Sequence, residues 1–351
     1  MAPPKPGSWT GLLDLSENNS TLGVPPVVMA SMRNASATGG PSFIAAASAR
    51  GGVPVDHILP GNGTLELIHA ACRALLAHAD RGGGRKDDFV IHGDHVAVMG
   101  PTFGEFRLAA EKAGAAVTEV PAAAENGFRW DIPEAARTIR SLRPAMVFVC
   151  NPNNPTGTYL SMGEAGELVA AAGAGTVILD EAYAGLVAAR WPVPREWLDT
   201  GRLLVLRSVS KACALEFLGA GYAVGAPALI RRIAEARGDM EMNPVTAAGA
   251  AAYLADPGLE RAAGEVLRAS LVELAAALAA AGFRVLPAAA NFTMVETGGA
   301  RRFRWEMMRR GVLAKELDGY GLPGWIRIAA PPPGTVPVVA RAFVAAREAL
   351  S

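Results

Sequence analysis

Lys211 occupies a position where a lysine is chemically informative. It is one of five lysines among 351 residues, and it stands between Ser208-Val-Ser210 and an apolar run from Ala212 to Leu215. Burial in such surroundings lowers the pKa of a lysine amine and makes it a nucleophile that can form a Schiff base with an aldehyde. We therefore take Lys211 as a candidate for covalent catalysis.

Three further polar motifs accompany this lysine. They are Asn-Pro-Asn-Asn-Pro-Thr-Gly at 151–157, Asp-Glu-Ala-Tyr at 180–183 and Gly-Asn-Gly-Thr at 61–64. Each has an ordinary structural explanation when taken alone. Asn, Pro and Gly favour turns, a glycine turn can simply begin a helix, and Asp180 can cap the helix after it.

Together, the four motifs match what pyridoxal phosphate requires of a protein. A glycine turn that opens a helix presents backbone amides to a phosphate, and an aspartate beside a pyridine nitrogen keeps that nitrogen protonated. An asparagine and a tyrosine can bind the phenolic oxygen, and the Lys211 amine can bind the aldehyde. The sequence predicts an enzyme that uses pyridoxal 5′-phosphate and has no metal site.

The motifs must be positioned by the elements that precede them. Short apolar runs alternate with helical periodicity, which is typical of an α/β fold with a mostly parallel sheet flanked by helices. Ligands of such folds bind at the carboxyl ends of the strands. The predicted strands are 95–99, 116–120, 145–150, 176–180 and 203–208, and the predicted helices are 64–79, 105–113, 132–141 and 162–172.

The pattern changes near residue 245 and predicts a smaller α+β domain. We expect an N-terminal arm at 1–40 that joins the small domain, a large cofactor-binding domain at 41–245 and a C-terminal small domain at 246–351. The small domain is predicted to contain helices at 258–281, 301–310 and 336–350 and strands at 283–286, 292–296 and 325–329.

The chain resembles fold-type-I pyridoxal-phosphate enzymes of the class I/II aminotransferase family. Within that family it is most similar to histidinol-phosphate aminotransferases and threonine-phosphate decarboxylases. The resemblance covers nearly the whole chain. The motifs that carry it are Asp14-Leu-Ser-Glu-Asn18, 59–68, 101–106, 151–157, 180–183, 208–211, 221–225, Asn291-Phe292 and Ile326-Arg-Ile328.

The resemblance implies roles for individual residues. Lys211 would hold the cofactor as a Schiff base and then act as the general base. Asp180 would pair with the ring nitrogen, while Asn154 and Tyr183 would bind the ring's 3-oxygen. The remaining contacts to cofactor and substrate would come from Phe103 against the ring face, from Gly63, Thr64, Leu65 and Ser208 at the phosphate, and from Arg327 and Asn18 at the substrate.

The chain departs from the family's pattern at two places. Gly219 stands where the family usually has an arginine that grips the cofactor phosphate, and Glu216 adds a negative charge nearby. The segment 37–43 lacks the tyrosine that usually reaches the partner subunit's phosphate. We expect a weaker hold on the phosphate unless another arginine, such as Arg207, compensates.

Transamination of an amino acid or amino phosphate is the leading prediction, and the departures favour a role in specialised metabolism. A decarboxylase, a lyase or a carbon–carbon bond-forming enzyme on the same scaffold is the first alternative, and a catalytically inactive ligand-binding member is the second. The resemblance also implies a homodimer. Lys+Arg and Asp+Glu both number 33, so we expect a small-molecule partner and no nucleic acid.

The cysteines and the apolar runs together predict the cellular compartment of the protein. The three cysteines lack paired spacing, which favours a reducing compartment. The longest apolar helical run, at 274–283, is too short to span a bilayer. We therefore expect a cytoplasmic protein.

Overall fold

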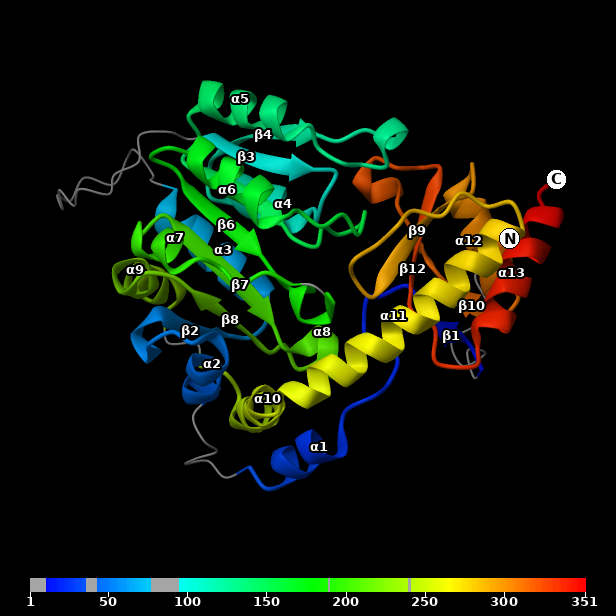
Figure 1. Ribbon diagram of the computed structural model, residues 1–351, viewed down its shortest axis with the longest axis horizontal. Coiled ribbons are helices and arrows are strands. Elements are labelled where there is room, and N and C mark those ends of the chain that lie inside the picture. The colour runs from blue at the N-terminus through cyan, green and yellow to red at the C-terminus, as the bar shows by residue number, and fades with distance from the viewer. Residues whose placement is uncertain (1–10, 36–42, 77–94, 189, 239–240) are drawn as a thin grey trace.

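The computed structural model describes residues 11–35, 43–76, 95–188, 190–238 and 241–351. Within these residues a seven-stranded sheet has the order β2-β8-β7-β6-β5-β3-β4 (Figure 1). Strands β3 to β7 are parallel to one another, and β8 is antiparallel to both β7 and β2. The strands are β2 (Ile58–Gly61), β3 (His95–Gly100), β4 (Ala116–Pro121), β5 (Met146–Cys150), β6 (Thr176–Asp180), β7 (Leu203–Ser208) and β8 (Gly221–Val224).

The central strands are apolar throughout because helices cover both faces of this sheet (Figure 1). Every residue of β5 and β6 is buried. Alternate residues face opposite sides: Val147, Val177 and Val205 belong to one core cluster, whereas Phe148 and Ile178 belong to the other. This two-sided burial explains why these strands were recognisable as continuous apolar runs.

The helices divide between the two faces. The first cluster takes side chains from α1 (Pro26–Arg33), α2 (Phe43–Gly51), α5 (Ile132–Leu142), α6 (Met162–Ala171), α7 (Arg195–Asp199), α8 (Ser210–Cys213) and α10 (Pro244–Ala255). The second cluster takes them from α3 (Thr64–Leu75), α4 (Glu105–Lys112) and α9 (Pro227–Arg237). Helix α10 therefore packs with the large sheet, against α1 and α2.

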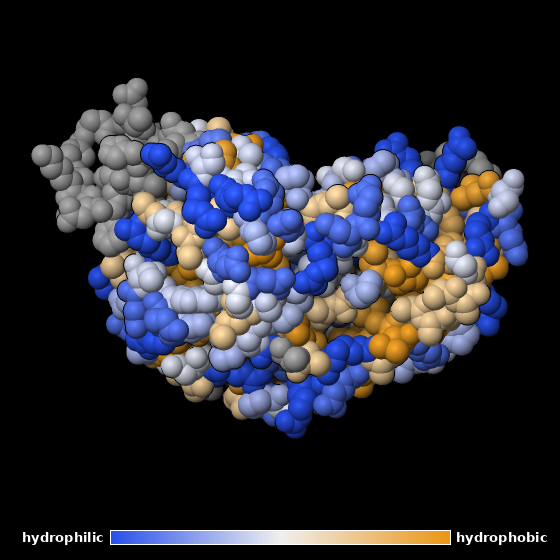
Figure 2. All heavy atoms as spheres, turned by 45° about the horizontal axis from the view of Figure 1, so that its top comes forward, coloured by the Kyte–Doolittle hydropathy of each residue, from blue (hydrophilic) through white to orange (hydrophobic). Residues whose placement is uncertain are grey.

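A second, antiparallel sheet with the order β11-β12-β9 lies beside the first. The long helix α11 (Pro257–Ala280) runs from α10 to this sheet (Figure 1). The space-filling view shows a surface hollowed between the two parts (Figure 2). The C-terminal elements are β9 (Phe292–Glu296), α12 (Ala300–Met308), β10 (Val312–Leu313), β11 (Lys315–Glu316), β12 (Trp325–Ala329) and α13 (Val336–Glu348).

The segment before α1 lies on these C-terminal elements. Strand β1 (Leu13–Asp14) pairs in parallel with β10. The backbone of Leu15 donates to Leu313 O and accepts from Ala329 N, and its side chain is buried in the C-terminal core. Residues at the two ends of the described chain thus share one hydrophobic cluster.

The structure confirms the main predicted strands within two residues. The predicted strand at 283–286 is wrong, because only Val285 pairs there, with Val295. Strands β2 and β8 were not predicted, because they are short, contain Gly or Pro, and pair with each other at an antiparallel edge. Helices α2, α9 and α10 were not predicted either. The predicted end of the helix at 64–79 lies outside the described residues.

Leu15→Ala tests the attachment of the N-terminal segment. The side chain is fully buried, so we expect the free energy of unfolding to fall by about 2–5 kcal/mol. Leu22→Ala is the control, since Leu22 is 39% exposed, and we expect little change. Urea unfolding of both variants measures the difference, and equal losses would contradict the packing described.

Candidate active site

A cavity of about 290 Å³ lies at the carboxyl ends of β5, β6 and β7. It brings together nine of the eleven residues that the sequence analysis assigned to the site. The other two, Gly63 and Leu65, flank Thr64, which does line the cavity. The lining residues are Glu17, Asn18, Thr64, Phe103, Cys150, Asn154, Asp180, Ala182, Tyr183, Ser208, Lys211, Lys315, Tyr320 and Arg327.

Lys211 lies on α8, just beyond the carboxyl end of β7. Its Nζ donates to Asn19 Oδ1 at 3.1 Å. Burial lowers the pKa of Lys211, although the carboxylates of Glu216 and Glu17 partly oppose this shift. The amine is thus held in place and is easier to deprotonate than an exposed lysine, as a nucleophile and base requires.

Asp180 ends β6 and is 3% exposed. The Ala182 amide donates to its Oδ1 at 2.9 Å. Burial raises the pKa of Asp180 to about 7, and the neighbouring Glu181 adds to the shift. No ion pair among the described residues includes Asp180, so the carboxylate faces the cavity without a cation. A protonated ring nitrogen would supply the missing positive charge.

Two amides and an arginine surround the space beside Tyr183. Asn18 Nδ2 lies 3.0 Å from Tyr183 Oη. Arg327 donates from Nη1 to Asn154 Oδ1 and from Nη2 to Ser16 O. Arg327 Nε and Asn18 Oδ1 are buried and have no partner among the described residues, and such unpaired polar atoms are costly unless a ligand satisfies them.

The turn before α3 presents amides to the cavity, but not all of those predicted. Gly63 has a φ of +83°, which glycine adopts readily. The Gly63 amide already donates to Gly61 O at 2.8 Å, so it is not free for a phosphate. The amides of Thr64 and Leu65 are the first of the helix and have no intrahelical acceptor. Leu65 can therefore contribute its backbone, while its side chain is 44% exposed.

Gly219 lies in close contact with the phosphate turn, and the suggestion that Arg207 replaces the missing arginine is wrong. Gly219 has a φ of +60°, and a Cβ built there would lie 2.9 Å from Asn62 O. Arg207 Nε donates to Glu181 Oε2 at 2.9 Å. It lines a neighbouring cavity, which shares Ser208 with the first, and does not line the first cavity itself. The tyrosine-free segment at 37–43 lies, apart from Phe43, outside the described residues.

Several residues that line the cavity had not been predicted as site residues. Asn19 follows the predicted Asn18 and contacts Lys211, and Cys150 precedes the Asn-Pro motif and pairs in register with Asp180. Both had a local signal, because they adjoin recognised motifs. Glu17 likewise lies inside the motif at 14–18, whereas Lys315 and Tyr320 had no local signal, since only the packing of the C-terminal sheet brings them to the cavity.

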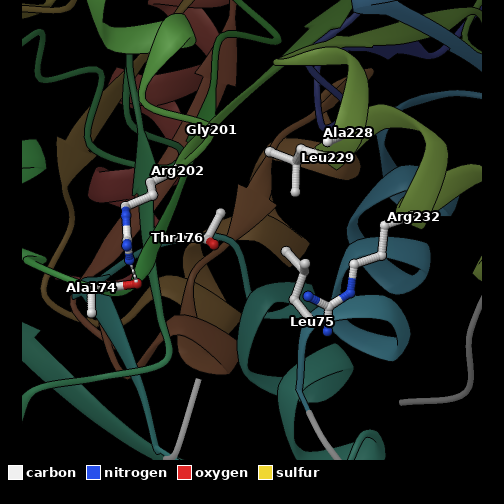
Figure 3. Close-up of a pocket in the computed structure, with 8 residues that line it drawn as sticks. All are labelled: Leu75, Ala174, Thr176, Gly201, Arg202, Ala228, Leu229 and Arg232. Atoms are coloured by element: carbon white, nitrogen blue, oxygen red, sulfur yellow. Dashed lines mark hydrogen bonds between the residues drawn. The ribbon is translucent and has the colours of Figure 1, made fainter. Parts of the chain in front are cut away.

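A second cavity, of about 50 Å³, lies at the opposite edge of the sheet, where β6 and β7 begin (Figure 3). Two arginines and the apolar side chains of Leu75 and Leu229 line it. Arg202 donates to Ala174 O and Arg232 donates to Ala74 O. Both guanidinium groups thus bind backbone carbonyls, and no group among these lining residues resembles the catalytic set.

The fold and this site together define a fold-type-I pyridoxal-phosphate enzyme. The aminotransferase class I and II family model matches residues 10–343, and the chain belongs to that family of pyridoxal-phosphate-dependent transferases. It is an aminotransferase by family, and amino compounds are the substrates of such enzymes.

Individual relatives agree with this assignment. The chain is 32% identical to histidinol-phosphate aminotransferase 2 of Ralstonia nicotianae over 90% of this chain and 84% of the relative. The histidinol-phosphate aminotransferase of Sinorhizobium meliloti, solved with pyridoxal-5′-phosphate, superposes with a TM-score of 0.79 at 23% identity, covering 97% and 92% of the two chains. Aspartate aminotransferase of Thermus thermophilus with maleate gives 0.81 at 20% identity, covering 95% and 91%.

Across the described residues, no helix combines the length and the apolar character that crossing a bilayer requires.

Asp180→Asn tests the electrostatics of the cavity in cofactor-free protein. Between pH 4 and pH 7 the native carboxyl holds its proton longer than the unfolded one, so native stability falls as the pH rises through this range. Removing the charge should therefore stabilise the protein, by up to about 4 kcal/mol at pH 8 and by little at pH 4. Urea unfolding at both pH values measures this.

Asp131→Asn is the matched control. Asp131 caps α5 through a bond to Glu134 N, and asparagine caps a helix equally well. We expect this variant to have the wild-type free energy of unfolding at pH 8. If Asp180→Asn showed no gain in stability at pH 8, the buried carboxyl would not have the raised pKa.

Proposed function

We propose that this enzyme transfers the amino group of an amino acid or amino phosphate, with Lys211 as its nucleophile and proton carrier. The observation that carries the proposal is the convergence of Lys211, Asp180, Asn154 and Tyr183 on one cavity in which Asp180 has no cation among the described residues. When bound, pyridoxal 5′-phosphate supplies an aldehyde that accepts amines and a protonated ring that withdraws electrons.

The chain's own residues then have separate tasks. Lys211 Nζ moves the proton from the substrate's Cα, and Asn19 orients that amine. Asp180 keeps the ring nitrogen protonated. Asn154 and Tyr183 hold the 3-oxygen, and Phe103 covers the ring face from its place on the cavity wall. Thr64, Ser208 and the Leu65 amide bind the phosphate.

The other end of the cavity selects an anionic substrate. Arg327 is 3% exposed and has an unpartnered Nε, and Lys315 and Tyr320 lie on the same wall. A guanidinium suits a carboxylate or phosphate group, and Asn18 offers a free amide oxygen to a donor on the substrate. The relatives' name makes histidinol phosphate the first amino phosphate to test.

Lys211→Ala tests the assignment. Pyridoxal 5′-phosphate should give the wild-type protein a visible absorption band of the lysine-bound cofactor, and the variant should lack that band. The variant should also lose a factor of at least about 10²–10⁴ in kcat, because both the general base and the covalent attachment are removed. Keto product and carbon dioxide are measured with histidinol phosphate and with amino acids as donors.

Lys112→Ala is the control, because Lys112 ends the surface helix α4 and should leave both the band and the rate unchanged. No band in the wild type would refute the proposed function. Carbon dioxide without keto product would refute transamination while leaving Lys211 in its role.

The surface beside the cavity supports a homodimer. Phe217 is 93% exposed and Leu218 is 43% exposed, and both precede Gly219, which contacts the turn at Gly63. Exposed apolar side chains that gather next to a site favour an interface. We propose that a second copy covers them.

Phe217→Ser is expected to weaken this dimer and raise its dissociation constant at least about tenfold, because it removes an aromatic side chain that the proposed interface would bury. Sedimentation velocity measures the change. Val272→Ser is the control, since Val272 is also exposed, at 70%, but lies on α11. A wild-type monomer would contradict the proposal.

We also propose a domain boundary within α11 and a cytoplasmic location for this chain. The packing of α10 with the large sheet supports moving the boundary from residue 245 into α11. The free, buried cysteines Cys72, Cys150 and Cys213 fit a cytoplasmic location.

A further inference from the structure

We propose that none of the described residues gives the cofactor's phosphate a cationic side chain, so that firm retention of the cofactor depends on the covalent link to Lys211. The inference rests on the proposed placement of the phosphate at Thr64 and Ser208. It predicts a difference between two forms of the cofactor. The aldehyde form, which bonds to Lys211, stays bound, whereas the amino form is released readily.

Apart from Lys211, which is reserved for the covalent link, the cations among the described lining residues come from the C-terminal sheet. Among the described residues that line the cavity, the basic ones are Lys211, Lys315 and Arg327. Lys315 and Arg327 come from β11 and β12, and Arg327 is bound to Asn154 and Ser16. Thr64 and Ser208 offer hydroxyl groups, and α3 offers the amides and the dipole of its first turn. All of these donors are neutral.

Backbone atoms of residues 219–221 and of the turn at 62–64 occupy the space in which a cationic side chain at position 219 would lie. A Cβ on Gly219 would lie 2.9 Å from Asn62 O, and one on Gly221 would lie 3.1 Å from Thr64 N. The stretch 219–221 therefore packs directly on the turn at 62–64, with no room for a side chain between them. The positive φ of Gly219 adds backbone strain for any other residue.

Among the described residues, the charged groups around this turn are paired with other groups or are negative. Arg237 donates to Pro60 O and lies beside Glu66, which accepts from Asn62 N. Arg207 is paired with Glu181 in the neighbouring cavity. Glu216 lies shortly before Gly219 in the chain, and its Oε2 is buried without a hydrogen-bond partner among the described residues. Its carboxylate is close enough to raise the pKa of Lys211 against the effect of burial. The same charge repels a phosphate dianion bound nearby.

The weak hold on the phosphate affects cofactor retention at one point of each catalytic cycle. When the donor's amino group passes to the cofactor, the donor's carbon leaves as a carbonyl compound with oxygen from water, and Lys211 returns to a free amine. The cofactor is then held by non-covalent contacts alone. A charge-assisted hydrogen bond to a phosphate contributes a factor of about ten to a hundred in affinity, and here that contribution is missing.

The test compares two ligands on cofactor-depleted wild-type protein. Pyridoxal 5′-phosphate can bond to Lys211, and pyridoxamine 5′-phosphate cannot. We expect the dissociation constant of pyridoxamine 5′-phosphate, measured by fluorescence titration, to be at least about a hundredfold higher. Glu216→Gln should lower that constant about tenfold and leave the binding of pyridoxamine, which has no phosphate, unchanged.

Glu125→Gln is the matched control, because Glu125 lies on an exposed turn of 3-10 helix away from the cavity, and it should change neither constant. Equal affinity for the two phosphorylated ligands would overturn the inference, and so would an unchanged constant in Glu216→Gln. If pyridoxal 5′-phosphate gave no absorption band of a lysine-bound cofactor, the proposed function itself would fail instead.

Discussion

The register of three parallel strands is the constraint on which the site depends. Cys150 pairs with Asp180, and Asp180 pairs with Leu206, so β5, β6 and β7 end side by side. The Asn-Pro motif, Asp180 and Ser208 therefore reach one cavity. A slip of one residue would turn Asp180 into the opposite core and bring Glu181 into its place. The apolar residues on both faces of these strands prevent that slip, because it would expose or misplace every one of them.

A second constraint is the segment 16–20, which connects the two sheets at the cavity. Ser16 O accepts from Arg327, Asn18 contacts Tyr183, and Asn19 accepts from Lys211. The arginine proposed for the substrate and the lysine proposed for catalysis are thus held by one short stretch of chain. Because Leu15 anchors this segment in the C-terminal core, the position of the small sheet is coupled to the geometry of the cofactor site.

The electrostatics of the cavity divide between its ends. Arg327 and Lys315 line the wall proposed for the substrate, where Lys315 Nζ lies 3.9 Å from Glu17 Oε1, and Asp180 lies at the place proposed for the ring nitrogen. Under the two proposals, cofactor retention would depend on the covalent bond to Lys211, whereas substrate selection would depend on the charge of Arg327.

Much of the site was readable from the sequence because its signals are local. Lys211, Asp180, Asn154 and Thr64 lie just after strands or a glycine turn, so a motif of a few residues identifies each one. The helix at α10 was missed because its small apolar residues lack a clear polar face.

Patterns of a few residues were enough to establish the family, the parallel sheet and the chemical set around Lys211. They could not reveal that Lys315 and Tyr320 reach the cavity, that Asn19 holds the lysine, or that the Gly63 amide is already bonded. Nor could they reveal that the backbone at Gly219 packs against Asn62 so closely that a side chain at position 219 would not fit there. Most of these contacts join segments far apart in the chain. Such contacts depend on how helices and sheets pack in three dimensions, which no local pattern specifies.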